Sequence, residues 1–295
     1  MSTQASLIED IKGIIQDTTF TSANILAYMN EGQKKIAGGV LLLYPDKTQV
    51  RSSPLPDLTA TDTLTSSLTL AYTSMPSDYD RNMYFVTSET NEIRVDVLTS
   101  LQELLDYYPA LDNTQQIRFA AISGSKLYYQ GMPSIAESLT VYYFRKPHDM
   151  ENYSVVTISF TETGSVIADS ASGLSGFYAG QTIDIAGTTN NNSVFTIATV
   201  ESDGSELTVD ETLTTEASGT KFTLRSRPDG LPEHLHEDLL VNYVAMKIFE
   251  RKSIVDSQKM GDAQRCKSFF NQAMLDMEAS TERAAEPITI VSRSY

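Results

Sequence analysis

The sequence predicts an α+β protein: a helical bundle with a β-meander, interrupted by an inserted, small all-β domain of the sandwich type. Apolar residues recur at helical spacing near both ends of the chain, and short β-prone runs separated by turn residues fill the middle. Lys and Arg are absent from residues 147 to 220. We therefore expect a discontinuous core of residues 1–150 and 227–295 around an inserted domain of residues 151–226.

The first 45 residues predict two helices. Leu7, Ile11 and Ile15 recur every four residues and form the apolar stripe of the first helix. Thr21 or Ser22 can cap the second helix. The apolar positions of that second helix are Ile25, Tyr28, Met29 and Ile36.

The clearest helix is expected over residues 229–251. Pro232 suits a first helical turn, because its missing N–H would be unpaired there anyway. Its wide apolar face comprises Leu235, Leu239, Leu240, Tyr243, Val244, Met246, Ile248 and Phe249. Another helix is predicted after Met260, with an apolar stripe of Cys266, Phe269, Phe270, Ala273 and Met277.

The middle of the predicted core consists of short strands. Residues 49–75 are rich in Thr, Ser, Leu and Pro and suit short edge strands and loops. Residues 83–87 and 92–97 predict a strand pair, and residues 100–106 predict a short helix with a capping-box pattern. Residues 116–144 predict a three-stranded meander.

The predicted inserted domain differs from its surroundings in composition. Short β-prone runs alternate there with Gly, Ser, Asn and Asp turns. The predicted strands are 155–160, 165–168, 182–185, 194–200, 206–209 and 221–224. Between Ser154 and Arg225 there are nine acidic residues against two basic ones, a net charge of −7.

Composition excludes several classes of site. The 295-residue chain has no long apolar run and no charged-then-apolar leader, so we expect neither a membrane span nor a secretory signal. One cysteine and three histidines provide neither an intramolecular disulfide nor a Cys/His zinc cluster. The net charge of −16 argues against a protein that grips nucleic-acid phosphates. The simplest reason for this acidity is solubility.

No catalytic, cofactor or metal site is expected. His234 and His236 lie two residues apart on a helix, unlike the four-residue spacing of zincins. Nucleophile elbows, P-loops and Cys–His pairs are absent from the sequence. Glycoside hydrolysis needs two carboxylates, and the pairs Glu162/Asp169 and Asp203/Glu206 could supply them. They are better explained as parts of an acidic, turn-rich surface.

Three tyrosine pairs, 107–108, 128–129 and 142–143, lack the interleaved Arg or Lys of a single-strand nucleic-acid platform. They are better explained as strand residues with one ring inside and one outside.

The C-terminal segment is the candidate partner-binding site. Pro287 stops the preceding helix, and the β-prone run after it alternates like a strand that is added to another chain's sheet edge. The alternative is a disordered terminus. The candidate contact residues are Pro287, Ile288, Ile290, Val291, Arg293 and Tyr295.

This order of elements resembles the head-to-tail adaptor proteins of tailed bacteriophages, the ring proteins beneath the portal. The stretches that carry the likeness are the N-terminal helical pair, 75–81, 119–133, 139–147 and 231–240. The inserted domain departs from the plain family pattern and is similar to Gly- and Thr-rich β modules of phage virion proteins, through 173–187 and 192–200.

The resemblance implies a non-enzymatic structural protein of the phage neck, made in the host cytoplasm and without cofactors. Its implied partners are the portal protein, tail or nozzle proteins and further copies of itself in a twelvefold ring, with double-stranded DNA passing through unbound. The C-terminal segment would then contact portal or the adjacent subunit. Two alternatives stay open: a host-surface or glycan-binding module that acts through the inserted domain, with Phe177 and Tyr178 lining a groove, and a tail-completion or neck protein.

Overall fold

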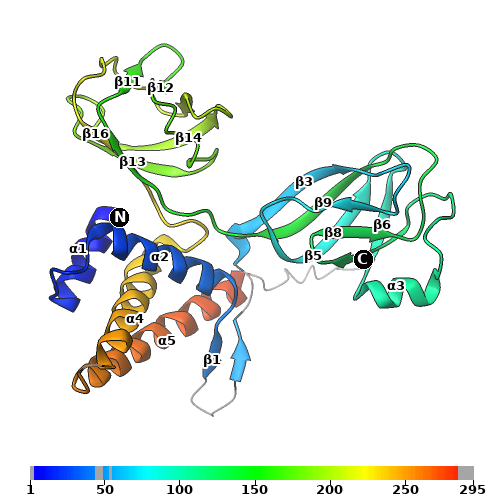
Figure 1. Cartoon of the computed structure of the whole chain (residues 1–295), viewed down its shortest axis with the longest axis horizontal. Coiled ribbons are helices and arrows are strands. Elements are labelled where there is room, and N and C mark those ends of the chain that lie inside the picture. Colours follow the sequence, from blue (N-terminus) through cyan, green and yellow to red (C-terminus); the bar gives the residue numbers. More distant parts are fainter. Residues whose placement is uncertain (1–2, 44–48, 53–54, 255, 285–295) are drawn as a thin grey trace, which may run out of the picture. The chain divides into compact units, whose positions relative to one another are not determined.

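The computed structural model describes residues 3–43, 49–52, 55–254 and 256–284. The chain divides into two compact units, one of Met1–Ser53 with Pro147–Tyr295 and the other of Pro54–Lys146 (Figure 1). The chain passes from one unit to the other at residues 53–54 and again at 146–147. The predicted division into an adaptor core and an inserted domain stays a prediction.

The predicted fold class, a helical bundle with a β-meander and a small β insertion, is wrong. The described residues form sixteen strands and five α-helices, and fourteen of the strands belong to two seven-stranded sheets. Residues 49–75, predicted as short edge strands and loops, supply the two edge strands of one seven-stranded sheet, β3 (Thr59–Thr65) and β4 (Tyr72–Ser74), which confirms that prediction. The strand β3 has five exposed residues and no buried one, so its sequence shows no apolar alternation.

Four of the helices belong to the unit of residues 1–53 and 147–295, and α4 contacts the other three. They are α1 (Gln4–Ile15), α2 (Ser22–Ala37), α4 (Asn242–Ser253) and α5 (Lys259–Ala284). The predicted cap of α2 is confirmed, because the side chain of Thr21 accepts a hydrogen bond from the backbone N–H of Asn24.

The chain enters α4 through irregular turns. A 3₁₀ turn, Glu233–Leu235, is followed by a π turn, Glu237–Val241. Because the π turn inserts an extra residue per turn, the consecutive side chains of Leu239, Leu240 and Val241 are all buried. The predicted helix over residues 229–251 is thus regular only in its C-terminal half.

The unit of residues 54–146 is built around one seven-stranded sheet, with strand order β3-β9-β5-β6-β7-β8-β4. Its further elements are the 3₁₀ turn η1 (Pro56–Leu58), β4 (Tyr72–Ser74), β5 (Tyr79–Ser88), β6 (Ile93–Leu98), α3 (Leu101–Tyr107), β7 (Phe119–Ser123), β8 (Lys126–Tyr129) and β9 (Ser138–Arg145). The predicted pairing of residues 83–87 with 92–97 is confirmed by β5 and β6. Only β6 and β7 run parallel among these described strands, and α3 connects them.

The core of this sheet comes from alternate residues of its strands. Tyr129 and Tyr143 are buried while Tyr128 and Tyr142 are partly exposed, which confirms the inside–outside interpretation of these two pairs. Tyr107 and Tyr108 lie instead at the end of α3, where Tyr107 is exposed.

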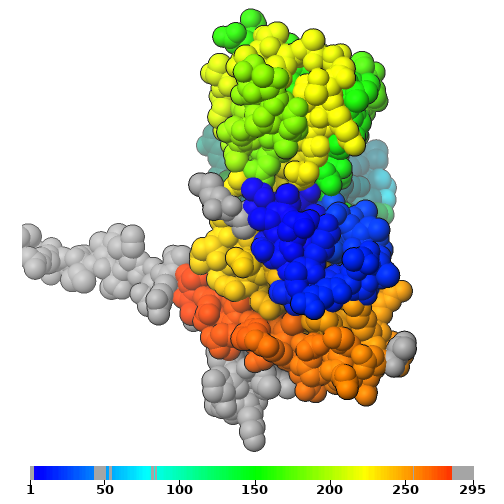
Figure 2. Space-filling model, turned by 90° about the vertical axis from the view of Figure 1, so that its left-hand side faces the viewer, coloured from blue at the N-terminus to red at the C-terminus, as the bar shows by residue number. Residues whose placement is uncertain are grey.

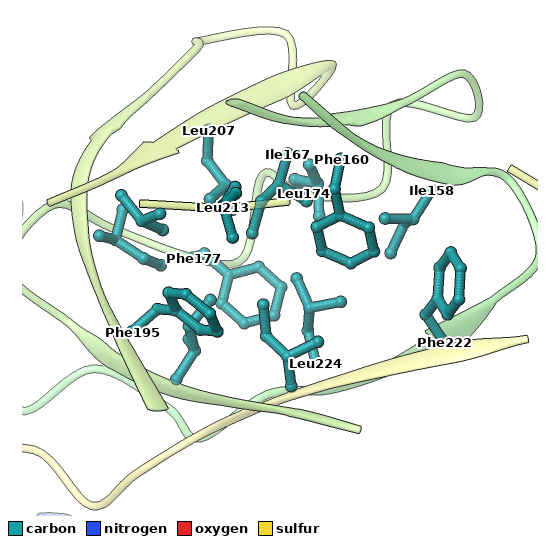
Figure 3. Packing of buried hydrophobic residues seen from close by; sticks show 14 residues of the cluster. Ile158, Phe160, Ile167, Leu174, Phe177, Phe195, Leu207, Leu213, Phe222 and Leu224 are labelled. Carbon is teal, nitrogen blue, oxygen red and sulfur yellow. The ribbon is translucent and has the colours of Figure 1, made fainter. Parts of the chain in front are cut away.

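Residues 152–226 form the second seven-stranded sheet, with strand order β10-β16-β13-β14-β15-β12-β11. Its strands are β10 (Asn152–Val155), β11 (Ile158–Thr161), β12 (Val166–Asp169), β13 (Thr182–Ala186), β14 (Val194–Val200), β15 (Glu206–Val209) and β16 (Phe222–Ser226). The predicted single strand 155–160 is two strands, because β10 pairs with β16 while β11 pairs with β12. The register shifts between Ile197 and Thr199, and fourteen buried side chains fill the interior (Figure 3).

The remaining strands, β1 (Leu41–Leu43) and β2 (Gln49–Arg51), form an antiparallel pair that follows α2.

Candidate functional site

The predicted partner-binding residues lie outside the part of the chain that the structure describes. They are Pro287, Ile288, Ile290, Val291, Arg293 and Tyr295, and their role stays a prediction. The structure instead shows three sets of polar side chains that connect different elements. They are an amide cluster on α1 and α2, the buried carboxylate of Glu137 in the 54–146 sheet, and the buried carboxylate of Asp169 in the 152–226 sheet.

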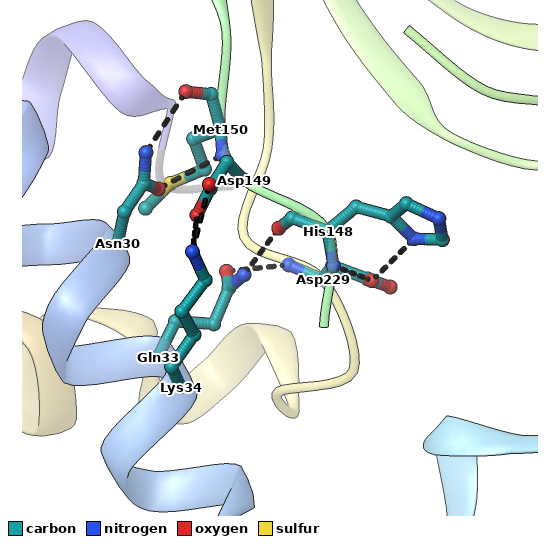
Figure 4. A network of polar contacts seen from close by, with 7 residues as sticks. All are labelled: Asn30, Gln33, Lys34, His148, Asp149, Met150 and Asp229. Atoms are coloured by element: carbon teal, nitrogen blue, oxygen red, sulfur yellow. Dashed lines mark hydrogen bonds and ion pairs between the residues drawn. The ribbon is translucent and has the colours of Figure 1, made fainter. Parts of the chain in front are cut away.

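Side-chain amides of α2 hold the two segments by which the chain enters and leaves the 152–226 sheet (Figure 4). The amide of Asn30 donates to the carbonyl of Met150 at 3.2 Å and accepts from the backbone N–H of the same residue at 2.8 Å. The amide of the fully buried Gln33 donates to the carbonyl of His148 at 2.6 Å and accepts from the backbone N–H of Asp229 at 2.8 Å. Gln33 therefore joins the entering and the leaving segment through one side chain.

The same junction has a second amide on α1. The side chain of Gln4, also fully buried, donates to the carbonyls of Glu151 (2.9 Å) and Ser226 (3.2 Å). These two residues pair directly, because the Ser226 N–H donates to the Glu151 carbonyl at 3.0 Å. We refer to Gln4, Asn30 and Gln33 as the amide clamp. The amide clamp provides hydrogen-bond partners for backbone N–H and C=O groups that would otherwise have none at the ends of the strands.

Charged and aromatic contacts surround the amide clamp. Lys34 forms an ion pair with Asp149 at 2.6 Å, and both side chains are about half exposed. The ring of His148 stacks on that of Tyr178, with centroids 3.6 Å apart, and its backbone N–H donates to the Asp229 carboxylate.

In the 54–146 unit, Glu137 is a buried carboxylate that ties loops together. It accepts hydrogen bonds from the Ser88 hydroxyl (2.8 Å) and from the Ile117 backbone N–H (3.1 Å). Its own N–H donates to the Ser66 hydroxyl at 2.7 Å. Glu137 thereby joins the end of β5 to the segments that follow β3 and precede β7, at one end of the sheet.

That end of the sheet presents exposed apolar side chains. Leu68 and Leu70 lie in the β3–β4 connection and Ile135 lies in the β8–β9 connection, and all three are exposed. The two connections are adjacent because Thr65 pairs with Ser138. Preorganised loops with exposed apolar tips are suited to docking a protein partner.

The two histidines near the start of the C-terminal helices, His234 and His236, have different surroundings. His234 is exposed, whereas His236 is buried with Nε2 2.9 Å from the Leu231 carbonyl oxygen. Burial lowers the pKa of His236, against the opposing effect of that carbonyl. Across the described ranges no group of three or more His, Cys, Asp or Glu side chains is arranged to hold a metal ion.

The acids considered for glycoside hydrolysis have structural contacts. Asp169 is buried and accepts from the Tyr153 hydroxyl at 2.6 Å and from the Gly173 N–H at 2.8 Å. Burial would raise the pKa of Asp169, but its hydrogen bonds outweigh burial and lower the pKa overall. Burial and the bond to Asp169 raise the pKa of Tyr153 to about 12. Asp203 accepts from the Ser205 N–H in a turn.

The aromatic groove of the glycan-binding alternative is not formed as expected. Phe177 is buried in the core of the 152–226 sheet, so it cannot line a groove beside Tyr178.

Comparison with known proteins places this arrangement in a family. The model of the SU10 adaptor protein family matches residues 2–162. The chain belongs to the SU10 adaptor protein family. It is accordingly a phage adaptor-type structural protein.

The part of this SU10 adaptor that matches the family contains α1, α2, the hairpin of β1 and β2, and the whole 54–146 unit. No curated protein matches the sequence. Among solved structures the chain is similar to the flagellar hook junction protein FlgK from Burkholderia pseudomallei, with 12% identity and a TM-score of 0.16, over 96% of this chain and 60% of that one. A likeness this weak carries no argument. Of the helices described, none combines the length and apolarity that crossing a membrane requires.

Sequence reasoning missed the amide clamp of the SU10 adaptor, although a signal was present. Gln33 lies four residues after Met29 and three before Ile36, within the apolar stripe of α2. A polar residue in such a position indicates a buried hydrogen bond. Its partners, His148 and Asp229, are more than 100 positions away, and no local pattern identifies them.

Proposed function

We propose that this SU10 adaptor forms the oligomeric ring that joins a phage portal to the tail and surrounds part of the DNA path. The observation that carries the proposal is the family match over residues 2–162, which includes the whole 54–146 unit. A twelvefold ring, the portal and tail partners and a location in the neck of the virion are parts of this proposal. The apolar loop tips with Leu68, Leu70 and Ile135 supply a surface for one of those protein contacts.

The charge of the chain supports passage of DNA without binding. Tight binding of a duplex, which carries about one charge per 1.7 Å of its axis, relies on clusters of Lys and Arg. This chain has 22 Lys and Arg against 38 Asp and Glu. Several of the cations are already paired with carboxylates, among them Lys34, Arg227 and Lys252.

The C-terminal segment is the part of the chain that we propose for contact with portal or with an adjacent subunit. Pro287 and the β-prone run after it follow directly on α5, which ends at Ala284. An extended apolar segment gains affinity by adding backbone hydrogen bonds to another chain.

The proposal is tested by native mass measurement of the purified protein with and without the portal protein. A ring that binds portal is expected for the full chain, and truncation after Arg283 should preserve folding and weaken portal binding. Unchanged portal binding by the truncated chain would refute the role of the segment. A stable monomer that never binds portal would refute the adaptor ring, and binding to tail proteins alone would favour a tail-completion protein instead.

A further inference from the structure

A groove with a volume of ≈ 600 Å³ lies between the C-terminal end of α1, α4 and the first turns of α5. Figure 2 shows the face on which α1, in dark blue, lies next to the orange helices α4 and α5. The groove is lined by Ile14, Ile15, Gln16, Asp17, Asn242, Phe249, Lys252, Lys259, Asp262, Arg265, Cys266 and Phe269. We call it the helical groove.

The helical groove has an apolar floor and an apolar rim. Ile15, Phe249 and Cys266 form buried parts of its lining. On the rim, Ile14 is 43% exposed and Phe269 is 51% exposed. Exposed large apolar side chains beside an apolar floor are typical of a surface that another chain covers.

The charges of the groove leave one cation available. Lys252 pairs with Asp17 at 2.7 Å, and Lys259 pairs with Asp262 at 3.2 Å. Arg265 instead lies over the ring of Phe269, 5.6 Å from its centroid, and within the described ranges it forms no ion pair. Three cations and two carboxylates give the lining a net charge of +1, in a chain whose net charge is −16.

The C-terminal segment, residues 285–295, has the complementary composition. It contains Ile288 and Ile290, two positions apart, which face the same side of an extended chain. Its side chains include one carboxylate, on Glu286, and one cation, on Arg293. The segment therefore offers a carboxylate for the available cation of the groove and an apolar face for its apolar rim.

Chain length disfavours the segment of the same molecule. Phe269 lies 15 residues before Ala284, which is about 22 Å along a helix with a rise of 1.5 Å per residue. Ile288, four residues beyond Ala284, reaches at most about 14 Å even when the chain is fully extended. Ile290 reaches about 22 Å only if no residue is used to reverse the direction of the chain. Ile288 of one chain therefore falls short of its own Phe269, and Ile290 reaches it only in a fully extended chain, so the segment of another copy fits better.

We propose that the helical groove binds the C-terminal segment of a second copy of this chain, with Ile288 and Ile290 against Ile14 and Phe269. The proposal rests on the proposed ring. A contact in which one copy donates a segment and the next receives it is head-to-tail, and such a contact closes into a ring when the rotation between copies permits. Arg265 pairs with a carboxylate of the incoming segment.

The test uses Cys266, which is the one cysteine of the chain and lies in the groove lining. A donor chain with Ile290→Cys and Cys266→Ala is co-expressed with the wild-type chain, and the full-length proteins are oxidised. We expect a disulfide-linked pair of donor and wild-type chains. The matched control donor carries Thr289→Cys, on the opposite face, and should cross-link about tenfold less, because only a docked thiol has a high effective concentration.

Cys266 is only 6% exposed, and burial raises the pKa of its thiol, so a second acceptor is needed. An acceptor with Phe269→Cys and Cys266→Ala places the thiol on the exposed rim, where the substitution leaves the core intact. The Ile290→Cys donor should link to it and the Thr289→Cys donor should not. Equal cross-linking by both donors, or none with either acceptor, would overturn the proposal.

Two further outcomes separate this inference from the proposed ring. A disulfide within one chain that carries both Cys266 and Ile290→Cys would show that the segment binds its own groove, which overturns the inference. A ring of unchanged mass with no cross-link overturns the inference and leaves the proposed function standing. A cross-linked ring that does not bind portal supports the inference and contradicts the portal-joining function.

Discussion

Replacing Gln33 by Ala is expected to destabilise the unit that contains the helices and the 152–226 sheet much more than replacing its exposed neighbour Lys34. The Gln33 side chain is fully buried and forms two hydrogen bonds, to the His148 carbonyl and from the Asp229 N–H. Alanine removes both bonds and leaves two partly buried backbone groups without this partner.

The magnitude follows from the two backbone groups that lose this partner. Leaving a buried donor or acceptor without its hydrogen bond costs about 1–3 kcal/mol. Both groups here are only partly buried, so the lower end applies to each and Gln33→Ala should lower the free energy of unfolding by about 2 kcal/mol. The total stability of a domain is about 5–15 kcal/mol. The loss is therefore a large fraction of the total.

The matched control is Lys34→Ala, one residue further along α2. Lys34 contacts the same entering segment through Asp149, but the two side chains are 52% and 46% exposed. An exposed ion pair contributes about 0–1 kcal/mol, so this variant should remain close to wild type. Urea unfolding followed by circular dichroism measures both. An equal decrease in the free energy of unfolding in the two variants would refute the stabilising role of the amide clamp. A decrease below about 0.5 kcal/mol for Gln33→Ala, the range of ordinary surface substitutions, would refute it as well.

Three further predictions concern stability and assembly. Because burial lowers the folded-state pKa of His236 below its unfolded value of about 6.5, only the unfolded chain gains a proton just below pH 6.5. The free energy of unfolding should therefore decrease as the pH is lowered through this range, by at most about 1.4 kcal/mol per pH unit. His236→Gln should remove this decrease and His234→Gln, at an exposed residue, should not, which urea midpoints at pH 7.5 and 5.5 would show. Glu137→Gln replaces one of two buried acceptor oxygens by a donor and should cost about 1–3 kcal/mol in urea unfolding, while Glu89→Gln, at an exposed residue, should cost almost nothing. Deletion of residues 152–225 with a short Gly/Ser turn should give soluble protein of unchanged oligomeric state by native mass, because Glu151 and Ser226 are hydrogen-bonded to each other, and insoluble protein would contradict this.

Local patterns in the sequence predict the helices and many strands correctly. The four-residue spacing of Leu7, Ile11 and Ile15 corresponds to the buried face of α1, and the strand pair of residues 83–87 and 92–97 corresponds to β5 and β6. These elements are encoded by residues that lie close together in the chain, so periodicity is sufficient to find them.

The sheet that holds the 54–146 unit together depends on pairings between distant residues. Thr59 pairs with Phe144 and Thr65 pairs with Ser138, more than 70 positions away, and β3 itself contributes no buried side chain. Its place in the sheet is set by β9, whose alternate residues are buried. The sequence therefore predicts an edge strand here, which the strand order confirms, but nothing within residues 59–65 identifies the strand with which it pairs.

Two residues depart from the apolar stripes of their helices in opposite ways: one is polar and buried, and the other is apolar and exposed. Gln33 is a polar residue inside the stripe of α2, and the structure explains it fully by hydrogen bonds to backbone of the same unit. Phe269 is an apolar residue predicted inside the stripe of α5, yet it is half exposed, because its neighbour Phe270 takes the buried position 100° away around the helix.

Contacts among the described residues explain why the polar Gln33 is buried, but they do not explain why the apolar Phe269 is exposed. The ring of Phe269 has Arg265 on one face and the helical groove beside it. Full burial of a Phe side chain is worth about 1.5–3 kcal/mol, so burial of the exposed half of Phe269 would be worth about 0.7–1.5 kcal/mol. In the proposed ring, Phe269 would gain this free energy at each subunit interface. If assembly is the function of this chain, Phe269→Ser should leave the folded monomer intact and shift the mass distribution toward smaller species.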